Sequence, residues 1–290
     1  MDTQVKIGIP KGSLQQSTID LFRRAGFDIQ VSSRSYFPTI DDAELSAIMF
    51  RAQEMSRYVE DGVVDAGLTG KDWIRENGSD VVEVCELTYS KATALPARWV
   101  LAVPNESPVQ KPEDLAGAII ATELVNVTKD YFAAKQLDVK VEFSWGATEV
   151  KARLLDGIVE ITETGSSIRA NNLRIIDTVM TSTTRLVANK EAWADPSRRE
   201  KIEAVALLLR AAIEGRQKVG LKLNLPVGKL SEAISLLPAE KSPTVNPLAD
   251  EAFVALEVIL EEAAARDLIP HLRKLGGSGI ITYPLNLVIA

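Results

Sequence analysis

The strongest constraint on the fold is a repeated unit in which a short apolar strand ends in a turn and a helix follows. Residues 5–10 form the first strand pattern, and Ser13 is placed to cap the helix after it. Residues 51–60 have helical character, and residues 63–68 give a second strand before the turn at residues 69–70. A repeated strand-helix order predicts a largely parallel sheet covered by helices.

A second group of short apolar strands fills the middle of the chain and predicts another α/β lobe. Its strands are expected at residues 99–104, 118–121, 139–143 and 158–161. Residues 183–188 then have the pattern of a strand that returns to the first lobe, and residues 199–216 that of a long amphipathic helix. Two lobes with a deep cleft between them fit this order.

The pattern changes after Gly215. Strands are expected at residues 219–225, 242–245, 253–260 and 279–283, with helices at 229–236 and 263–275. Residues 253–260 fit either period, and their length and β-branched content favour a strand. The resulting βαββαβ order predicts a ferredoxin-like domain. We therefore expect a first lobe over residues 1–96 and 184–214, a second lobe over 97–183 and a C-terminal domain over 215–290.

Composition excludes several classes of function. The 290 residues contain one cysteine, Cys85, and one histidine, His271, so disulfide frameworks, multi-histidine metal sites and Ser-His or Cys-His catalytic pairs are close to excluded. We expect His271 at the surface and Cys85 as a small buried residue. The net charge of -7 argues against broad nucleic-acid binding but permits an anionic small ligand.

No apolar stretch approaches the roughly 18 residues that span a membrane, and residues 1–6 lack the features of a signal peptide. We therefore expect a cytoplasmic protein.

The most informative segment is residues 156–168, where a buried strand ends in Glu160 and Glu163 and a Thr-Gly-Ser-Ser turn follows. The N–H groups and hydroxyls of this turn suit a phosphomonoester, and the two carboxylates suit vicinal hydroxyls. The four residues of the turn are Thr164, Gly165, Ser166 and Ser167. An ordinary helix start with acidic residues near its dipole explains the pattern equally well.

Two more turns of the same kind are candidates for contact with phosphates. Lys11 and Gly12 follow the first strand, and Thr69 and Gly70 follow the second. Ligands of open α/β sheets bind at the carboxyl ends of strands. Lys11 is otherwise a solvated loop lysine, and Arg51 either reaches the cleft or pairs with Glu54 at the surface.

Taken together, these segments resemble the long form of the ATP phosphoribosyltransferase family, the first enzyme of histidine biosynthesis. Residues 11–14 are similar to its Lys-Gly-Arg-Leu loop, 65–72 to its Asp-x-Gly-Ile-Thr-Gly-x-Asp segment and 160–167 to its phosphoribosyl-pyrophosphate loop. Residues 169–173 resemble the Arg-Ala-Asn-Gly-Leu that follows. Residues 237–238, 241–245 and 283–286 resemble signatures of the regulatory domain. Ser13, Glu160 and Ser167 depart from the family's frequent arginine, aspartate and threonine.

The resemblance implies a type II periplasmic-binding-protein-like pair of lobes and an ACT-like, ferredoxin-like regulatory domain. It implies that Mg²⁺-bound phosphoribosyl pyrophosphate occupies the second lobe, that ATP lies across the cleft and that adenine N1 attacks the anomeric carbon. The implied contacts to phosphoribosyl pyrophosphate are Glu160, Glu163, Thr164, Gly165, Ser166 and Ser167, with Glu160 also a candidate Mg²⁺ ligand. The implied contacts to ATP are Lys11, Gly12, Thr69, Gly70 and Lys91, with Lys11 and Arg51 as catalytic cations.

The resemblance further implies feedback inhibition by histidine and a homo-oligomer that alternates between dimer and hexamer. Asn224, Ser242 and Thr244 lie at strand positions that match the family's effector pocket; purely structural hydrogen bonding is their alternative role. Two other interpretations of the whole chain remain open at this point. One is a two-lobed binding protein without catalysis, and the other is a catalytic subunit that needs a separate regulatory partner.

Overall fold

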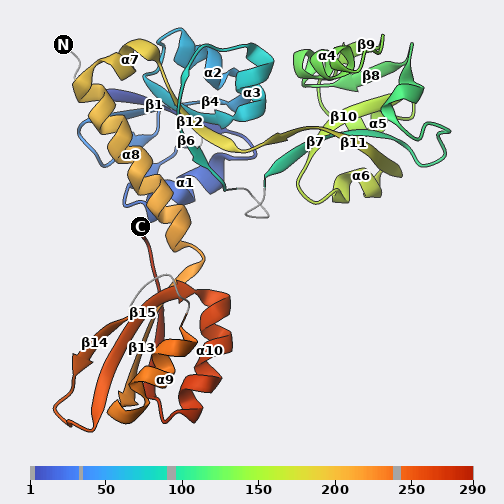
Figure 1. The fold of residues 1–290 in the computed structure, drawn as a ribbon. Helices are drawn as coiled ribbons and strands as arrows, with labels where there is room; N and C mark the ends of the chain where they lie inside the picture. The colour runs from blue at the N-terminus through green and yellow to red at the C-terminus, as the bar shows by residue number, and fades with distance from the viewer. Residues whose placement is uncertain (1–3, 33–34, 90–95, 238–242, 290) are drawn as a thin grey trace. The chain divides into compact units, whose positions relative to one another are not determined.

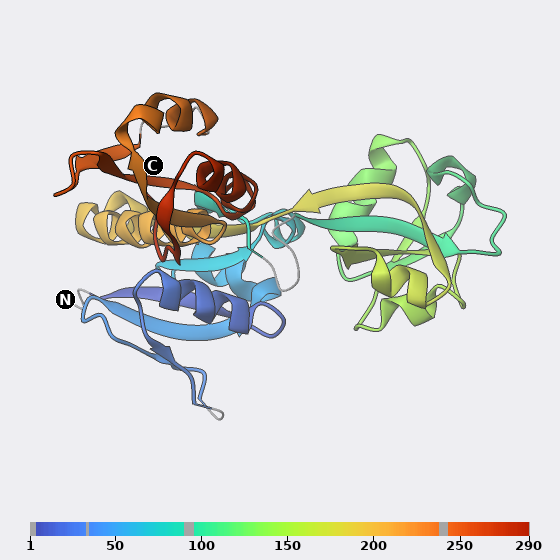
Figure 2. The same ribbon diagram turned by 90° about the horizontal axis from the view of Figure 1, so that it is seen from below.

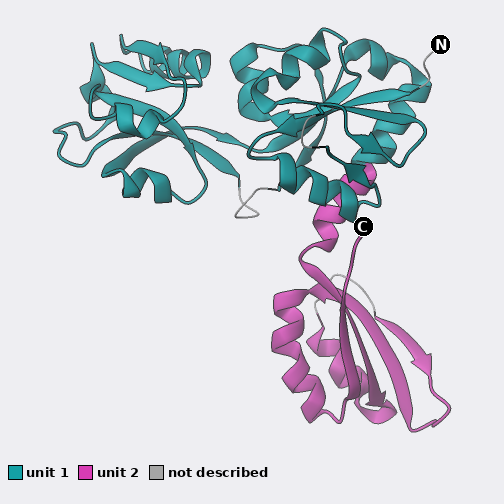
Figure 3. Cartoon of the chain, turned by 180° about the vertical axis from the view of Figure 1, so that it is seen from behind, with its two compact units in different colours: residues 1–206 teal, residues 207–290 magenta. Residues whose placement is uncertain are grey.

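The computed structural model describes residues 4–32, 35–89, 96–237 and 243–289. It divides the chain into two compact units, residues 1–206 and 207–290 (Figure 3). This division falls within helix α8 (Pro196–Gly215), whereas the sequence pattern places the domain boundary at residue 215. The two units are described separately.

The first lobe of the first unit is built on a five-stranded sheet in the order β4-β1-β5-β12-β6. Its strands are β1 (Val5–Lys11), β4 (Leu45–Arg51), β5 (Ala66–Gly70), β6 (Val82–Leu87) and β12 (Thr184–Ala188). Strands β4 and β5 run parallel to β1, whereas β12 is antiparallel to both of its neighbours. A short hairpin of β2 (Ile29–Gln30) and β3 (Thr39–Ile40) precedes β4.

Helix packing in this lobe depends on two glycines. Its helices are α1 (Gln15–Arg24), α2 (Ala52–Glu60), α3 (Lys71–Asn77), α7 (Lys190–Ala194) and the first half of α8. Gly8 of β1 and Gly67 of β5 pair with each other, and a Cβ atom on either would lie within 3 Å of the Met55 sulfur of α2. The missing side chains let α2 pack close to the sheet, which brings its first residues to the carboxyl ends of β1 and β4.

The second lobe repeats the architecture of the first. Its sheet has the order β9-β8-β10-β7-β11. The strands are β7 (Ala97–Pro104), β8 (Ile119–Thr122), β9 (Lys140–Phe143), β10 (Gly157–Thr162) and β11 (Leu173–Ser182). The helices are α4 (Val125–Ala134), α5 (Thr148–Lys151) and α6 (Ser166–Ala170), with a 3-10 turn at Pro112–Leu115. Trp99, Leu101, Ile120 and Phe132 are central to its core.

The two sheets share one topology because each holds a strand in the same position that is antiparallel to its neighbours. In the first lobe this strand is β12, which the chain forms after leaving the second lobe; in the second lobe it is β7, formed on arrival. Strands β7 and β11 pair with each other and connect the lobes (Figures 1 and 2). This exchange is the predicted type II periplasmic-binding-protein-like architecture.

The second unit contains a four-stranded antiparallel sheet in the order β14-β15-β13-β16. Its elements are β13 (Lys218–Pro226), α9 (Leu230–Leu236), β14 (Thr244–Pro247), β15 (Phe253–Glu261), α10 (Glu262–Lys274) and β16 (Ser278–Pro284). Alternate apolar residues of β13 and β15 pack with α9 and α10 in one core. The βαββαβ order with this strand arrangement confirms the ferredoxin-like prediction, including the strand at residues 253–260.

Several local predictions were wrong. Arg51 is the last residue of β4, with extended backbone, and is not the first residue of a helix. Strands β6 and β11 were not anticipated, and Cys85 of β6 is half-buried, not buried. His271 lies exposed on α10, as predicted. Among the described residues, no helix is both long enough and apolar enough to cross a membrane.

Candidate active site

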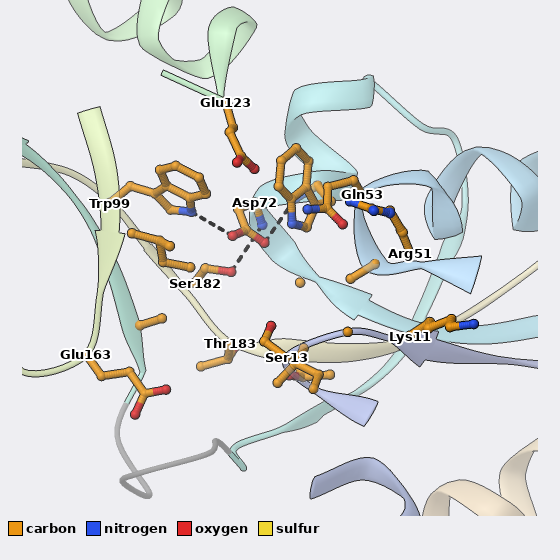
Figure 4. Close-up of a pocket in the computed structure, with 18 of the residues that line it drawn as sticks. Lys11, Ser13, Arg51, Gln53, Asp72, Trp99, Glu123, Glu163, Ser182 and Thr183 are labelled. Atoms are coloured by element: carbon orange, nitrogen blue, oxygen red, sulfur yellow. Dashed lines mark hydrogen bonds between the residues drawn. The ribbon is translucent and has the colours of Figure 1, made fainter. Parts of the chain in front are cut away.

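A cavity of about 1060 Å³ lies within the first unit and is lined by residues of both lobes. The first lobe contributes the turns that follow β1, β4 and β5, and the second lobe contributes the ends of β8 and β10. The carboxyl ends of parallel strands meet at one edge of a sheet, so turns far apart in the sequence reach the same cavity. Figure 4 shows Lys11 and Arg51 on one side of the cavity, and Glu163, Trp99 and Glu123 on other sides.

Lys11 and Arg51 form the cationic side of the cavity. They are register partners at the ends of β1 and β4, so their side chains start from adjacent backbone positions. The Lys11 ammonium lies 3.6 Å from the centre of the Tyr36 ring, which is a cation–π contact. Gly12 follows with φ of +106°, a conformation that glycine adopts without strain, and the chain then enters α1.

The predicted phosphate turn follows β10 and lies on the second lobe. Thr164, Ser166 and Ser167 line the main cavity, whereas Gly165 lines a separate, smaller cavity of about 320 Å³. The pattern of the turn predicted that the Gly165 N–H faces a bound phosphate. It donates instead to Thr162 Oγ1 at 2.8 Å. The Thr164 hydroxyl donates to Ser166 Oγ at 3.0 Å.

Carboxylates surround the turn. Burial raises the pKa of Glu160 to about 7; donation from Thr148 and the Ile161 N–H offsets this only in part, and the charges of Glu149 and Glu123 add to it. Glu160, Glu163 and Glu123 all line the cavity. Three of the cavity's carboxylates therefore belong to the second lobe, and Glu160 among them changes charge near neutral pH; Glu54 and Asp72 of the first lobe also line the cavity.

A buried carboxylate joins the lobes at the cavity wall. Asp72 of α3 is 2% exposed; its Oδ2 accepts from the Trp99 indole N–H at 2.6 Å, and its backbone N–H donates to Ser182 Oγ at 3.2 Å (Figure 4). Trp99 lies near the start of β7 and Ser182 is the last residue of β11, so Asp72 contacts both of the strands that connect the lobes. Trp73 packs edge-to-face on Trp99 with ring centres 6.1 Å apart. Burial raises the pKa of Asp72 despite these hydrogen bonds.

A second contact between the lobes involves Glu76 of α3. Its two carboxylate oxygens accept the backbone N–H groups of Asn126 and Val127 at 2.9 and 3.0 Å, at the start of α4. The Asn126 side-chain amide donates back to the Glu76 carbonyl at 2.9 Å. Glu76 therefore provides the N-terminal cap that α4 lacks in its own sequence, where position 124 is a leucine.

Most of the predicted site residues lie together. The predicted residues that line the main cavity are Lys11, Gly12, Arg51, Gly70, Glu160, Glu163, Thr164, Ser166 and Ser167. Thr69 does not line it: the residue is fully buried, and its hydroxyl donates to the Ala52 carbonyl at 2.7 Å. Lys91 and Ser242 lie outside the described residues.

Several lining residues were not anticipated. They are Asp72, Trp73, Trp99, Glu123, Thr162 and Ser182 to Thr184. Asp72 ends the 65–72 segment that the sequence analysis singled out, so its position in that segment was the available signal. Trp99 and Ser182 carried none, because their role depends on the pairing of β7 with β11.

The described residues offer no preformed metal cage. No group of three or more His, Cys, Asp or Glu side chains in the described ranges is arranged to hold a metal ion. In the second unit, Asn224 and Thr244 are exposed on β13 and β14, and β15 lies between these two strands. Asn224 alternates with the core residues Leu223 and Leu225, and Thr244 pairs with Glu257, which alternates with core residues of β15. Both side chains therefore lie on the sheet face opposite the helices.

Comparisons with known proteins agree along the whole chain. A profile described as ATP phosphoribosyltransferase matches residues 51–211, and one described as the HisG C-terminal domain matches residues 215–287. The ATP phosphoribosyltransferase of Chlorobaculum parvum is 57% identical over 286 residues, which is 98% of this chain and 97% of the relative. That of Geotalea daltonii is 54% identical over the full length of both chains. A solved ATP phosphoribosyl transferase (HisG:HisZ) complex from Thermotoga maritima is similar, with a TM-score of 0.62 and 27% identity over 73% of this chain and 98% of that one.

Proposed function

Since this chain belongs to the ATP phosphoribosyltransferase family and is a pentosyltransferase of histidine biosynthesis, we propose that it transfers the phosphoribosyl group of phosphoribosyl pyrophosphate to adenine N1 of ATP. The products are phosphoribosyl-ATP and pyrophosphate. The observation that carries the proposal is the division of one cavity between a cationic edge, Lys11 and Arg51, and a hydroxyl-rich turn bordered by carboxylates. Family membership also argues against the alternative interpretation of the chain as a two-lobed binding protein without catalysis.

The second lobe is the proposed site of phosphoribosyl pyrophosphate. The hydroxyls of Thr164, Ser166 and Ser167 are placed to bind its 5′-phosphate, and Glu160 and Glu163 to accept hydrogen bonds from the ribose hydroxyls. The substitution of serine for threonine at position 167 keeps the hydroxyl, and that of glutamate for aspartate at position 160 keeps the carboxylate. Gly165 contributes the shape of the turn.

The first lobe is the proposed site of ATP and of charge on the leaving group. Gly12 and Gly70 let the backbone approach the nucleotide, and Lys11 and Arg51 supply positive charge. Thr69 supports this site from beneath through its bond to Ala52. Ser13 lines the cavity but carries no charge, whereas the family frequently has arginine at this position. Lys11 and Arg51 therefore supply the positive charge at this end of the cavity.

The proposed reaction needs alignment more than it needs a nucleophilic side chain. The bond from ribose C1 to the pyrophosphate oxygen breaks, the pyrophosphate leaves with the electron pair, and a bond from C1 to adenine N1 forms. Positive charge develops on the ribose while negative charge develops on the leaving oxygens. The carboxylates Glu160 and Glu163 face the first, and Lys11 and Arg51 the second.

We further propose that Mg²⁺ enters with the substrate. The described residues do not form a cage for a metal, which fits an ion held mainly by phosphate oxygens and water, with Glu160 as the one candidate protein ligand. When bound, the ion would neutralise pyrophosphate charge. Because ATP is the acceptor, we place the enzyme in the cytoplasm, with no nucleic-acid or membrane partner.

Histidine inhibition is proposed for the C-terminal domain, at the exposed sheet face that carries Asn224 and Thr244, with Ser242 as a further candidate. The chain contains its own HisG C-terminal domain, which supports regulation without a separate regulatory subunit. We also propose a homo-oligomer that alternates between dimer and hexamer. Size-exclusion chromatography with and without histidine measures this.

A direct assay tests the reaction. Purified protein is mixed with ATP, phosphoribosyl pyrophosphate and Mg²⁺, and adduct formation is followed by ultraviolet absorbance with and without histidine. Absence of adduct under every condition refutes the activity, whereas adduct insensitive to histidine refutes only the regulation. Lys11→Gln should lower kcat/KM at least tenfold, while Lys6→Gln, an exposed lysine at the other end of the same strand, should not.

A further inference from the structure

The peptide group between Thr164 and Gly165 is held at both of its polar atoms. The Thr164 carbonyl accepts from Arg169 Nη1 at 3.2 Å, and the Gly165 N–H donates to Thr162 Oγ1 at 2.8 Å. Thr162 ends β10, and Arg169 lies on α6. One peptide plane of the turn is therefore fixed by two side chains from the elements that flank it.

Gly165 makes this arrangement possible in two ways. Its φ of +73° is one that side chains disfavour, and a Cβ atom built on it would lie 3.0 Å from Arg169 Nη1. The guanidinium thus lies in tight contact with the position at which a side chain of residue 165 would begin. Both residues line the smaller cavity behind the turn, away from the main cavity.

Orientation of this plane determines what the rest of the turn presents. With the Gly165 N–H directed at Thr162, the next residues, Ser166 and Ser167, line the main cavity together with Thr164. The plane is joined to the Cα atoms of Thr164 and Gly165, so a change in its orientation changes ψ of Thr164 and φ of Gly165. These two angles set where the Thr164 hydroxyl and the Ser166 N–H lie relative to each other. Preorganised donors bind an anion without first paying for their own ordering.

We propose that Thr162 and Arg169 are positioning residues for the phosphate-binding turn, which act by fixing the Thr164–Gly165 peptide so that the turn is arranged for the 5′-phosphate of phosphoribosyl pyrophosphate. This inference rests on the proposed function of the turn. Neither residue is assigned a contact with the substrate.

Two single variants and their double test the proposal. Thr162→Val keeps the shape and removes the acceptor, and Arg169→Met keeps much of the length and removes the donor. Each should raise the KM and the calorimetric Kd for phosphoribosyl pyrophosphate about three- to tenfold, with kcat and the KM for ATP within twofold of wild type. Thr162→Ser should restore the wild-type values.

The double variant is the sharper measurement. Both side chains act on one peptide, so the double variant should raise the KM by clearly less than the product of the two single effects. Matched controls are Thr122→Val, which removes a similar bond to the Leu124 N–H at the end of β8, and Arg153→Met, which removes an exposed charge from the same lobe. Both controls should leave the KM for phosphoribosyl pyrophosphate within twofold of wild type.

Three results would overturn the proposal. In the first, the double variant raises the KM for phosphoribosyl pyrophosphate by the full product of the two single effects. In the others, the KM for ATP rises in parallel, or Thr122→Val raises the KM for phosphoribosyl pyrophosphate as much as Thr162→Val does. Melting temperatures identify variants that lose fold and binding together, which also counts against a positioning role. If wild type forms no adduct, the proposed function fails; the calorimetric Kd for phosphoribosyl pyrophosphate then still decides whether Thr162 and Arg169 organise an anion site.

Discussion

Glu160 should make the first unit less stable as the pH rises through neutrality. Burial raises its pKa from 4.5 to about 7 in the folded protein, so the folded state holds a proton that the unfolded chain releases near pH 4.5. Stability from this group is complete below about pH 4.5 and is lost as the pH rises through 7. This direction is opposite to that of a carboxylate in an ion pair.

The size of the effect follows from the shift. A difference of about 2.5 pKa units corresponds to roughly 3 kcal/mol, of which about 2 to 3 kcal/mol falls between pH 5 and pH 8. Glu160→Gln removes the titrating group and keeps its shape. The difference in the free energy of unfolding between wild type and Glu160→Gln should therefore change by about this amount across that interval, in favour of the variant at high pH.

The assay can report on the first unit alone. All four tryptophans, at positions 73, 99, 145 and 193, lie in residues 1–206, so urea unfolding followed by tryptophan fluorescence detects that unit. Measurements in metal-free buffer at several pH values compare wild type, Glu160→Gln and Glu200→Gln, an exposed carboxylate of α8. Parallel pH profiles for wild type and Glu160→Gln would refute the reasoning.

Two contacts between the lobes give further predictions. Glu76→Ala removes the acceptor for the N–H groups of Asn126 and Val127. In the same urea assay it should lower the free energy of unfolding of the first unit by about 1–2 kcal/mol, and it should speed amide exchange in the first turn of α4. Glu76→Gln should have an intermediate effect. Trp99→Phe leaves the buried Asp72 carboxylate without its indole donor, so it should cost about 1–3 kcal/mol and more at pH 8 than at pH 5; a cost independent of pH would assign the loss to packing alone.

The sequence predicts the fold where apolar runs end in strong turn signals. The strand at residues 5–10 follows from an apolar run that ends in a proline. The helix after it was predicted with Ser13 as its cap; the helix is present at Gln15–Arg24, but its N-cap is Leu14 and no side chain caps it. Strand β11 was missed because its ladder with β7 has irregular register at two places, between Ile175 and Asp177 and between Thr178 and Met180. These irregularities break the alternation of period two on which strand prediction depends.

The site is predictable to the extent that its residues follow strands directly. Lys11 and Glu160 were found because turns after parallel strands point to one edge of a sheet. The bond between Asp72 and Trp99 was not, because it depends on the exchange of β7 and β12 between the two lobes. For Arg51 the sequence left open whether the side chain reaches the cavity or pairs with Glu54, because the residue was assigned to the first turn of a helix; it is instead the last residue of β4.

Under the proposed function, the distribution of charge in the cavity lets an acidic chain act on two anionic substrates. The cations Lys11 and Arg51 belong to the first lobe, which also contributes the carboxylates Glu54 and Asp72. The carboxylates Glu123, Glu160 and Glu163 belong to the second lobe. In the proposed complex, phosphoribosyl pyrophosphate meets carboxylates on the second lobe. Its recognition there is expected to depend on neutral hydroxyl and N–H donors that are fixed in advance and so compete with water. The proposed reaction assigns the charge of its leaving group to Lys11 and Arg51 of the first lobe. The proposed reaction therefore needs both lobes, and we expect the contacts that hold them together to affect catalysis as well as stability.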